Sequence, residues 1–122
     1  MRILIAVLFL AFTFFSRAQT PTANFTASPL VVCVGVPVNF TNTSVPNGTS
    51  AIVSNAWDFG DGALSTQVSP SHAFSTAGTF TVTLVVTNAN GIVDAEIKSA
   101  YITVNPLPIV AFSVNGLGCT VP

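Results

Sequence analysis

The chain has 122 residues, enough for one ordinary domain and part of another. Two of its three basic residues, Arg2 and Arg17, lie in the first eighteen positions. Beyond them Lys98 stands alone against four acidic residues, a net charge of 1 − 4 = −3. One cation cannot neutralise a phosphate backbone, so this charge balance excludes nucleic acid as a partner.

Residues 1–18 are typical of a secretory signal peptide. Arg2 precedes an almost wholly apolar run from Ile3 to Phe15, and Ser16 and Ala18 form the small-x-small arrangement of a cleavage site. A membrane anchor is the alternative, but the run is shorter than the roughly 20 residues that a helical span needs. We therefore expect cleavage after Ala18, no membrane span in the mature chain, and a secreted or cell-surface location.

The mature part is rich in Thr, Val, Asn and Phe, the residues of half-buried strands and their turns. Short runs in which every second residue shares a face predict strands, and "PNGTS" at residues 46–50 predicts a loop between two of them. In chain order, the early strands are predicted at residues 23–27, at Val38, Phe40 and Asn42, at Val53, Asn55, Trp57 and Phe59, and at residues 64–68.

The clearest alternation lies in "TFTVTLVVTN", residues 79–88. It places Phe80, Val82, Leu84 and Val86 on one face, predicted to be the core face. "NANG" then predicts a turn into a second extended stretch that ends in "AYITV", so the two form a hairpin. No window shows a helical period. We expect an all-β, immunoglobulin-like two-sheet β-sandwich of about six or seven strands.

A partial internal repeat follows this domain. "VAFSVNGLGCTVP" at residues 110–122 is similar to residues 23–37, with Phe112 placed 112 − 25 = 87 residues after Phe25. We divide the chain into a signal peptide (1–18), a sandwich domain (19–104), a Pro-rich linker (105–108) and the start of a second, truncated repeat (109–122). Residues 107–122 are too few to bury their own apolar face and are expected to stay unfolded or loosely docked.

The stretch "NAWDFGDGALS", residues 55–65, holds the single tryptophan of the chain. Trp57 and Phe59 share the predicted core face, while Asp58 faces the other side. The sequence Gly60-Asp61-Gly62 then predicts a tight turn, in which Asp58 and Asp61 accept hydrogen bonds from nearby amides.

This ordered set of motifs resembles the PKD domain, an immunoglobulin-like module of secreted proteins, here of the type found in secreted and surface proteins of Bacteroidetes. "WDFGDG" is the family's most telling motif, and "SPSHAFSTAGTFTVTLVVTNANG" at residues 69–91 is similar to the rest of its signature. The resemblance covers residues 23–104. It implies structural roles for Trp57, Asp58, Phe59, Gly60, Asp61, Gly62, His72 and Gly78.

Other roles for these residues are weaker. Trp57 would need an exposed face to stack on sugar. Some PKD-like domains bind calcium, which leaves Asp58 and Asp61 as weak candidates although their spacing is unlike an EF-hand loop. A catalytic His72 would need an activated nucleophile, and one histidine with two distant cysteines makes no zinc set. We assign no catalytic residue, no cofactor and no metal site.

The two cysteines do not match the family pattern. The resemblance implies that a cysteine at the place of Cys33 pairs with one directly after the "NG" turn, where this chain has Ile92. Cys119 is the equivalent of Cys33 in the second repeat and lies a domain away. We expect Cys33 to be an unpaired, mostly buried thiol.

Two non-catalytic functions remain open. The first is an extracellular interaction or spacer module of a longer adhesin-like protein, with adjacent domains of the same chain as its neighbours. The alternative is an accessory domain that binds carbohydrate or protein and targets a secreted hydrolase to its substrate. Catalysis by the domain itself is not expected, because no activated nucleophile accompanies His72.

Overall fold

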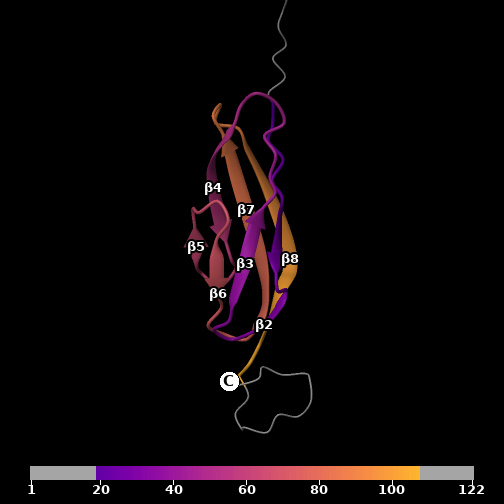
Figure 1. Cartoon of the computed structure of the whole chain (residues 1–122), viewed down its shortest axis with the longest axis vertical. Helices are drawn as coiled ribbons and strands as arrows, with labels where there is room; N and C mark the ends of the chain where they lie inside the picture. Colours follow the sequence, from indigo (N-terminus) through magenta and orange to yellow (C-terminus); the bar gives the residue numbers. More distant parts are fainter. Residues whose placement is uncertain (1–18, 108–122) are drawn as a thin grey trace, which may run out of the picture.

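The computed structural model describes residues 19–107, which form two β-sheets packed face to face, with strands running along the long axis of the domain (Figure 1). The smaller sheet has the order β1-β3-β6 and the larger β2-β8-β7-β4-β5. The strands are β1 (Phe25–Ser28), β2 (Val31–Cys33), β3 (Pro37–Asn42), β4 (Ile52–Asp58), β5 (Leu64–Ser65), β6 (Ser71–Ala73), β7 (Gly78–Asn88) and β8 (Val93–Asn105).

The predicted all-β, two-sheet sandwich is confirmed, with eight strands in place of six or seven. The two strands that the sequence did not reveal are β2 and β6, each three residues long. β2 runs parallel to the end of β8, and β6 pairs with β3. The described residues include no helix long and apolar enough to cross a membrane.

An aromatic cluster fills the space between the sheets. Trp57, 1% exposed, comes from the larger sheet and meets Phe25 of the smaller sheet edge to face, with ring centroids 5.1 Å apart. Its indole Nε1 donates a hydrogen bond to the carbonyl oxygen of Gln67 at 2.9 Å. Trp57 is therefore a core residue, as predicted, and its buried face cannot stack on sugar. The other fully buried aromatic side chains are Phe25, Phe40, Phe59 and Phe74.

The hairpin of β7 and β8 forms the centre of the larger sheet. The two strands are antiparallel, and Val82, Leu84 and Val86 are fully buried, which confirms the predicted core face. Asn88 ends β7 with a side chain that is 1% exposed. Its Oδ1 accepts hydrogen bonds from the N–H groups of Asn90 and Ile92, both at 3.0 Å, so this amide closes the turn.

One prediction for β4 is wrong. Val53 was expected to share a face with Trp57, but it is 64% exposed. The register of β4 against β7 shifts between Ile52 and Ser54, so the alternation of faces is interrupted there. Such a bulge reverses which residues face the core on its far side, and Ile52 packs against the core in place of Val53.

The prediction for Cys33 is also wrong, because this cysteine is disulfide-bonded and only partly buried. The prediction treated the second cysteine as a domain away. In the fold, Cys33 lies beside Asn105, the last residue of β8, where the chain leaves the sandwich. Cys119 follows 119 − 105 = 14 residues later in the sequence, outside the described residues.

The predicted domain boundaries stay predictions. β8 extends to Asn105, one residue beyond the predicted end of the sandwich. The predicted signal peptide (1–18) and the truncated repeat (109–122) lie outside the described residues, as does the predicted behaviour of the tail beyond Leu107.

Candidate functional site

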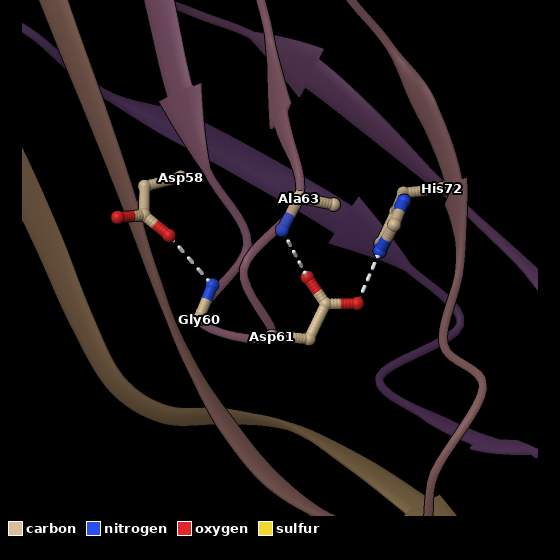
Figure 2. A network of polar contacts seen from close by, with 5 residues as sticks. All are labelled: Asp58, Gly60, Asp61, Ala63 and His72. Atoms are coloured by element: carbon tan, nitrogen blue, oxygen red, sulfur yellow. Dashed lines mark hydrogen bonds and ion pairs between the residues drawn. The ribbon is translucent and has the colours of Figure 1, made fainter.

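The Gly-Asp-Gly turn between β4 and β5 is held by its own aspartates (Figure 2). The N–H of Gly60 donates to Asp58 Oδ1 at 2.9 Å, and the N–H of Ala63 donates to Asp61 Oδ1 at 3.0 Å. Both carboxylates thus satisfy an amide two residues ahead, the usual role of Asp in tight turns. The prediction that these aspartates cap nearby amides is confirmed.

His72 joins this turn to the smaller sheet. Its Nε2 lies 2.7 Å from Asp61 Oδ2, and the dashed line in Figure 2 marks this contact. The imidazole ring also stacks on Phe59, with centroids 4.2 Å apart and planes within 6°. Since Asp61 follows β4 and His72 lies in β6, the pair ties the two sheets together at this end of the sandwich.

The pKa of Asp61 reflects this setting. Burial of the side chain, which is 12% exposed, by itself raises the pKa. The hydrogen bonds from His72 and from the Ala63 N–H, with the charge of His72, outweigh burial and hold the pKa of Asp61 below its ordinary value. The ionised carboxylate is therefore the form that the fold stabilises.

Gly60 is required by both its backbone angle and its surroundings. Its φ is +83°, and a Cβ at this position would lie 2.4 Å from the carbonyl oxygen of Thr81 in β7. Gly62 has a similar φ of +92°, but a Cβ there would meet no atom within 4 Å. The turn therefore rests on β7 at Gly60 and is open at Gly62.

Asp58 and Asp61 are not gathered around a common point. Both oxygens of Asp61 already accept hydrogen bonds, and Asp58 lies on the other side of the turn (Figure 2). Within residues 19–107, no three His, Cys, Asp or Glu side chains form a group that could hold a metal ion. The geometry supports a structural role for these aspartates, while calcium binding itself stays an untested alternative.

The outer face of the larger sheet is a candidate surface for recognition. Three rows of directly opposed residues cross it, and all point away from the buried row of Trp57 and Leu84. The rows are Leu64, Asp58, Thr83 and Ile97; Ala56, Val85 and Ala95; and Ser54, Thr87 and Val93.

This outer face is apolar and almost uncharged. Leu64, Ile97 and Val93 are 74%, 62% and 58% exposed, and Asp58 at the margin is the single charged residue of the three rows. Apolar side chains exposed together on one sheet face make that face a candidate interaction surface. These residues were not among the site residues predicted from the sequence. The outward series of Thr and Val in β7 was visible, but its partners depend on the register of four strands.

Comparison with protein families matches residues 18–104 to the PKD domain. A microbial collagenase of Vibrio alginolyticus is 44% identical over 61 residues, which cover 48% of this chain and 7% of that protein. The pre-pro-metalloprotease PrtV of Vibrio cholerae is 36% identical over 85 residues, 69% of this chain and 9% of that protein. The chain thus spans less than a tenth of the length of these relatives.

Solved structures agree with this match. The PKD1 domain of the Vibrio cholerae metalloprotease PrtV superposes with a TM-score of 0.59 at 33% identity, covering 69% of this chain and 98% of that one. A structure described for carbohydrate-binding modules of the β-sandwich superfamily gives a TM-score of 0.65 at 30% identity, covering 70% of this chain and 34% of that one. The family match spans most of the described domain, and this chain belongs to the PKD domain family.

Proposed function

We propose that this PKD domain is an accessory binding domain that targets a secreted hydrolase to a protein substrate. The observation that carries the proposal is the mostly apolar outer face of the larger sheet, which carries a single charge at Asp58 and has Leu64, Ile97 and Val93 more than half exposed. The relatives support it, because their similar segments are small parts of a microbial collagenase and a pre-pro-metalloprotease. These relatives favour an accessory domain over the spacer module, the other function that the sequence left open.

The aromatic residues favour a protein partner over a carbohydrate. Sugar-binding surfaces commonly use an exposed aromatic ring, which combines a large apolar face with a polar handle. In the described part of the chain, Trp57 and four phenylalanines are fully buried, and Phe80 and Tyr101 are only partly exposed. The outer face presents aliphatic and Thr side chains, which suit contact with an uncharged stretch of protein.

Carbohydrate is the second candidate ligand. It is supported by the similarity to the structure described for carbohydrate-binding modules. Binding of this kind would have to use hydroxyl groups such as those of Thr83 and Thr87, since no aromatic side chain lies in the three outer rows.

Two further parts of the proposal rest on sequence and relatives. The signal-peptide pattern of residues 1–18 and the protease context of the relatives support an extracellular location. The absence of catalysis by this domain rests on His72, whose ring is engaged by Asp61 and Phe59 in a structural contact.

A retention assay tests the proposal. The mature domain is incubated with insoluble collagen and, in parallel, with insoluble polysaccharides such as cellulose and chitin, and the bound fraction is measured. Ile97→Lys places a charge on the outer face, at the β8 end of the row that Ile97 shares with Asp58 and Thr83. Val68→Lys is the matched control, because Val68 is equally exposed, 65% against 62%, but lies in the loop between β5 and β6.

We expect wild type and Val68→Lys to be retained on collagen and Ile97→Lys to lose at least about tenfold in affinity, since a buried unpaired charge costs several kcal/mol. Retention on polysaccharide alone would favour the second candidate. Equal retention of Ile97→Lys and wild type would rule out the outer face as the binding surface, and no retention on any support would return the domain to the spacer function.

A further inference from the structure

The first described residue, Gln19, is hydrogen-bonded to the domain through both its side chain and its main chain. Its side-chain Oε1 accepts a hydrogen bond from the N–H of Thr49 at 2.9 Å, and its main-chain oxygen accepts one from Asn88 Nδ2 at 2.8 Å. The donors belong to the loop before β4 and to the end of β7. A surface glutamine held in this way by two distant segments has a defined position.

The loop before β4 is fitted to this side chain. Gly48 has φ +134°, and a Cβ there would lie 1.9 Å from Gln19 Oε1 and 2.7 Å from Nε2. Only a residue without a Cβ allows the loop to approach the Gln19 amide so closely. The segment that follows is also anchored: Pro21 is fully buried, and the N–H of Ala23 donates to Asp94 Oδ2 at 2.7 Å.

The sequence predicts cleavage after Ala18, which makes Gln19 the first residue of the mature chain. We propose that the mature N-terminus is a pyroglutamyl residue formed from Gln19. The α-amino nitrogen attacks Cδ of its own side chain, and a five-membered lactam forms. The bond from Cδ to Nε2 breaks, and Nε2 leaves as ammonia with a proton from the amine. No oxidant, reductant or second reactant is consumed.

The contacts of Gln19 use two atoms that this product keeps. Both acceptors that the domain uses, Oε1 and the main-chain oxygen, are retained in the lactam. The atom that is lost is Nε2, which is not the atom bonded by Thr49 or Asn88. The N–H of Thr49 also points at the oxygen on which negative charge develops during the attack, where a fixed donor stabilises the transition state.

The modification would remove a positive charge and a free amine from the chain terminus. A lactam has no amine for an aminopeptidase to recognise, which is an advantage in an environment that contains secreted proteases. This inference rests on the predicted cleavage after Ala18 and is independent of the proposed binding function, so each can fail without the other.

Amine labelling tests the proposal, because Lys98 is the one lysine of residues 19–122. The full chain, residues 1–122, is expressed in a secreting bacterium, and the exported protein is unfolded, reductively dimethylated and only then digested for mass spectrometry. Labelling before digestion blocks any free terminal amine, so that cyclisation of the peptide after digestion is not mistaken for the modification. We expect label at Lys98 alone, and an N-terminal peptide that begins at residue 19 and is lighter by one ammonia.

The matched control is Gln19→Asn. Its side chain is one methylene shorter and cannot close the same five-membered ring, so this variant should take up label at two amines, Lys98 and the terminus. A labelled terminal amine on Gln19 in the wild type, or a mature chain beginning at another residue, would overturn the proposal.

Hydrogen exchange tests the docking separately. In the cyclised wild type the amide hydrogen of Thr49 should remain protected, because the lactam oxygen still accepts it. In Gln19→Ala, which has no side-chain acceptor, this hydrogen should exchange at least about tenfold faster, as expected when a hydrogen bond worth roughly 1 kcal/mol or more is lost. Equal protection in both proteins would show that Gln19 does not hold the Thr49 loop.

Discussion

The two faces of the larger sheet carry similar side chains but differ in how far these are exposed. On the inner face Val82, Leu84 and Val86 are fully buried, while on the outer face Leu64, Ile97 and Val93 are more than half exposed. Both faces carry apolar side chains on the same strands. The inner residues are covered by the smaller sheet and stabilise the fold, whereas the outer residues are exposed and form the proposed binding surface.

The largest expected effect is a loss of stability when Trp57, the central side chain of the inner aromatic cluster, is truncated. Trp57→Ala removes a side chain that is 1% exposed and contacts Phe25 and Phe40. Truncation of such a residue costs about 3–5 kcal/mol, a large part of the roughly 5–15 kcal/mol that stabilises a domain. Urea unfolding at neutral pH measures it.

Trp57→Phe is the control for this cluster. It keeps an aromatic ring but loses the Nε1–H that donates to Gln67, so it should cost clearly less than the alanine variant. If Trp57→Ala lowered the free energy of unfolding by less than about 1 kcal/mol, the cluster would not contribute the stability that its burial implies.

The next effect lies in the turn between β4 and β5, where two glycines can be compared directly. Gly62→Ala places a Cβ in open space and should cost only about 1–2 kcal/mol for the left-handed backbone. Gly60→Ala adds a Cβ 2.4 Å from a main-chain oxygen of β7 and should cost more than Gly62→Ala, because the backbone of β7 must move. Equal midpoints of urea unfolding for the two variants would show that the turn does not rest on β7.

The inner face was largely predictable from sequence, because it depends on local patterns. The alternation of residues 79–88 and the "WDFGDG" motif placed Trp57, Leu84 and Val86 in the core. The short strands β2 and β6 were not predictable, since three residues carry too little alternation and their ladders are completed by β8 and β3. Val53 was misplaced because a register shift leaves no local mark in the sequence.

The candidate sites depend on contacts between distant residues. The hydrogen bonds within the turn were predicted, because Asp58 and Asp61 cap amides two residues ahead. The pairing of Asp61 with His72 joins two sheets and could not be derived from spacing. The outer face requires the register of β5, β4, β7 and β8 together, so Ile97 and Leu64 became candidates only in the fold.

A smaller effect is expected from pH at the His72 contact. The folded pKa of Asp61 lies below its ordinary value of 3.8, so the unfolded chain binds the proton more readily. The contribution of this carboxylate to stability is therefore fully present above 3.8 and is lost as pH falls through the folded pKa. Urea midpoints measured from about pH 6 to pH 2 should fall more steeply in wild type than in Asp61→Asn.

His72→Phe sharpens this test. It keeps an aromatic ring against Phe59 but removes the nitrogen that bonds Asp61, so the pH dependence should weaken in the same direction as in Asp61→Asn. Identical pH profiles in wild type and Asp61→Asn would contradict the assignment of this acid sensitivity to Asp61.

The smallest effect on stability should come from the outer face. Leu64→Lys and Ile97→Lys replace side chains that are 74% and 62% exposed, so each should change the free energy of unfolding by no more than about 0.5 kcal/mol. Their collagen binding, however, should fall together, because the two positions flank Asp58 and Thr83 in one row of the sheet. If either variant unfolded at a clearly lower urea concentration than wild type, Ile97 or Leu64 would belong to the residues that stabilise the fold. Unchanged stability with lost binding would separate the two faces of the sheet, one for folding and one for recognition.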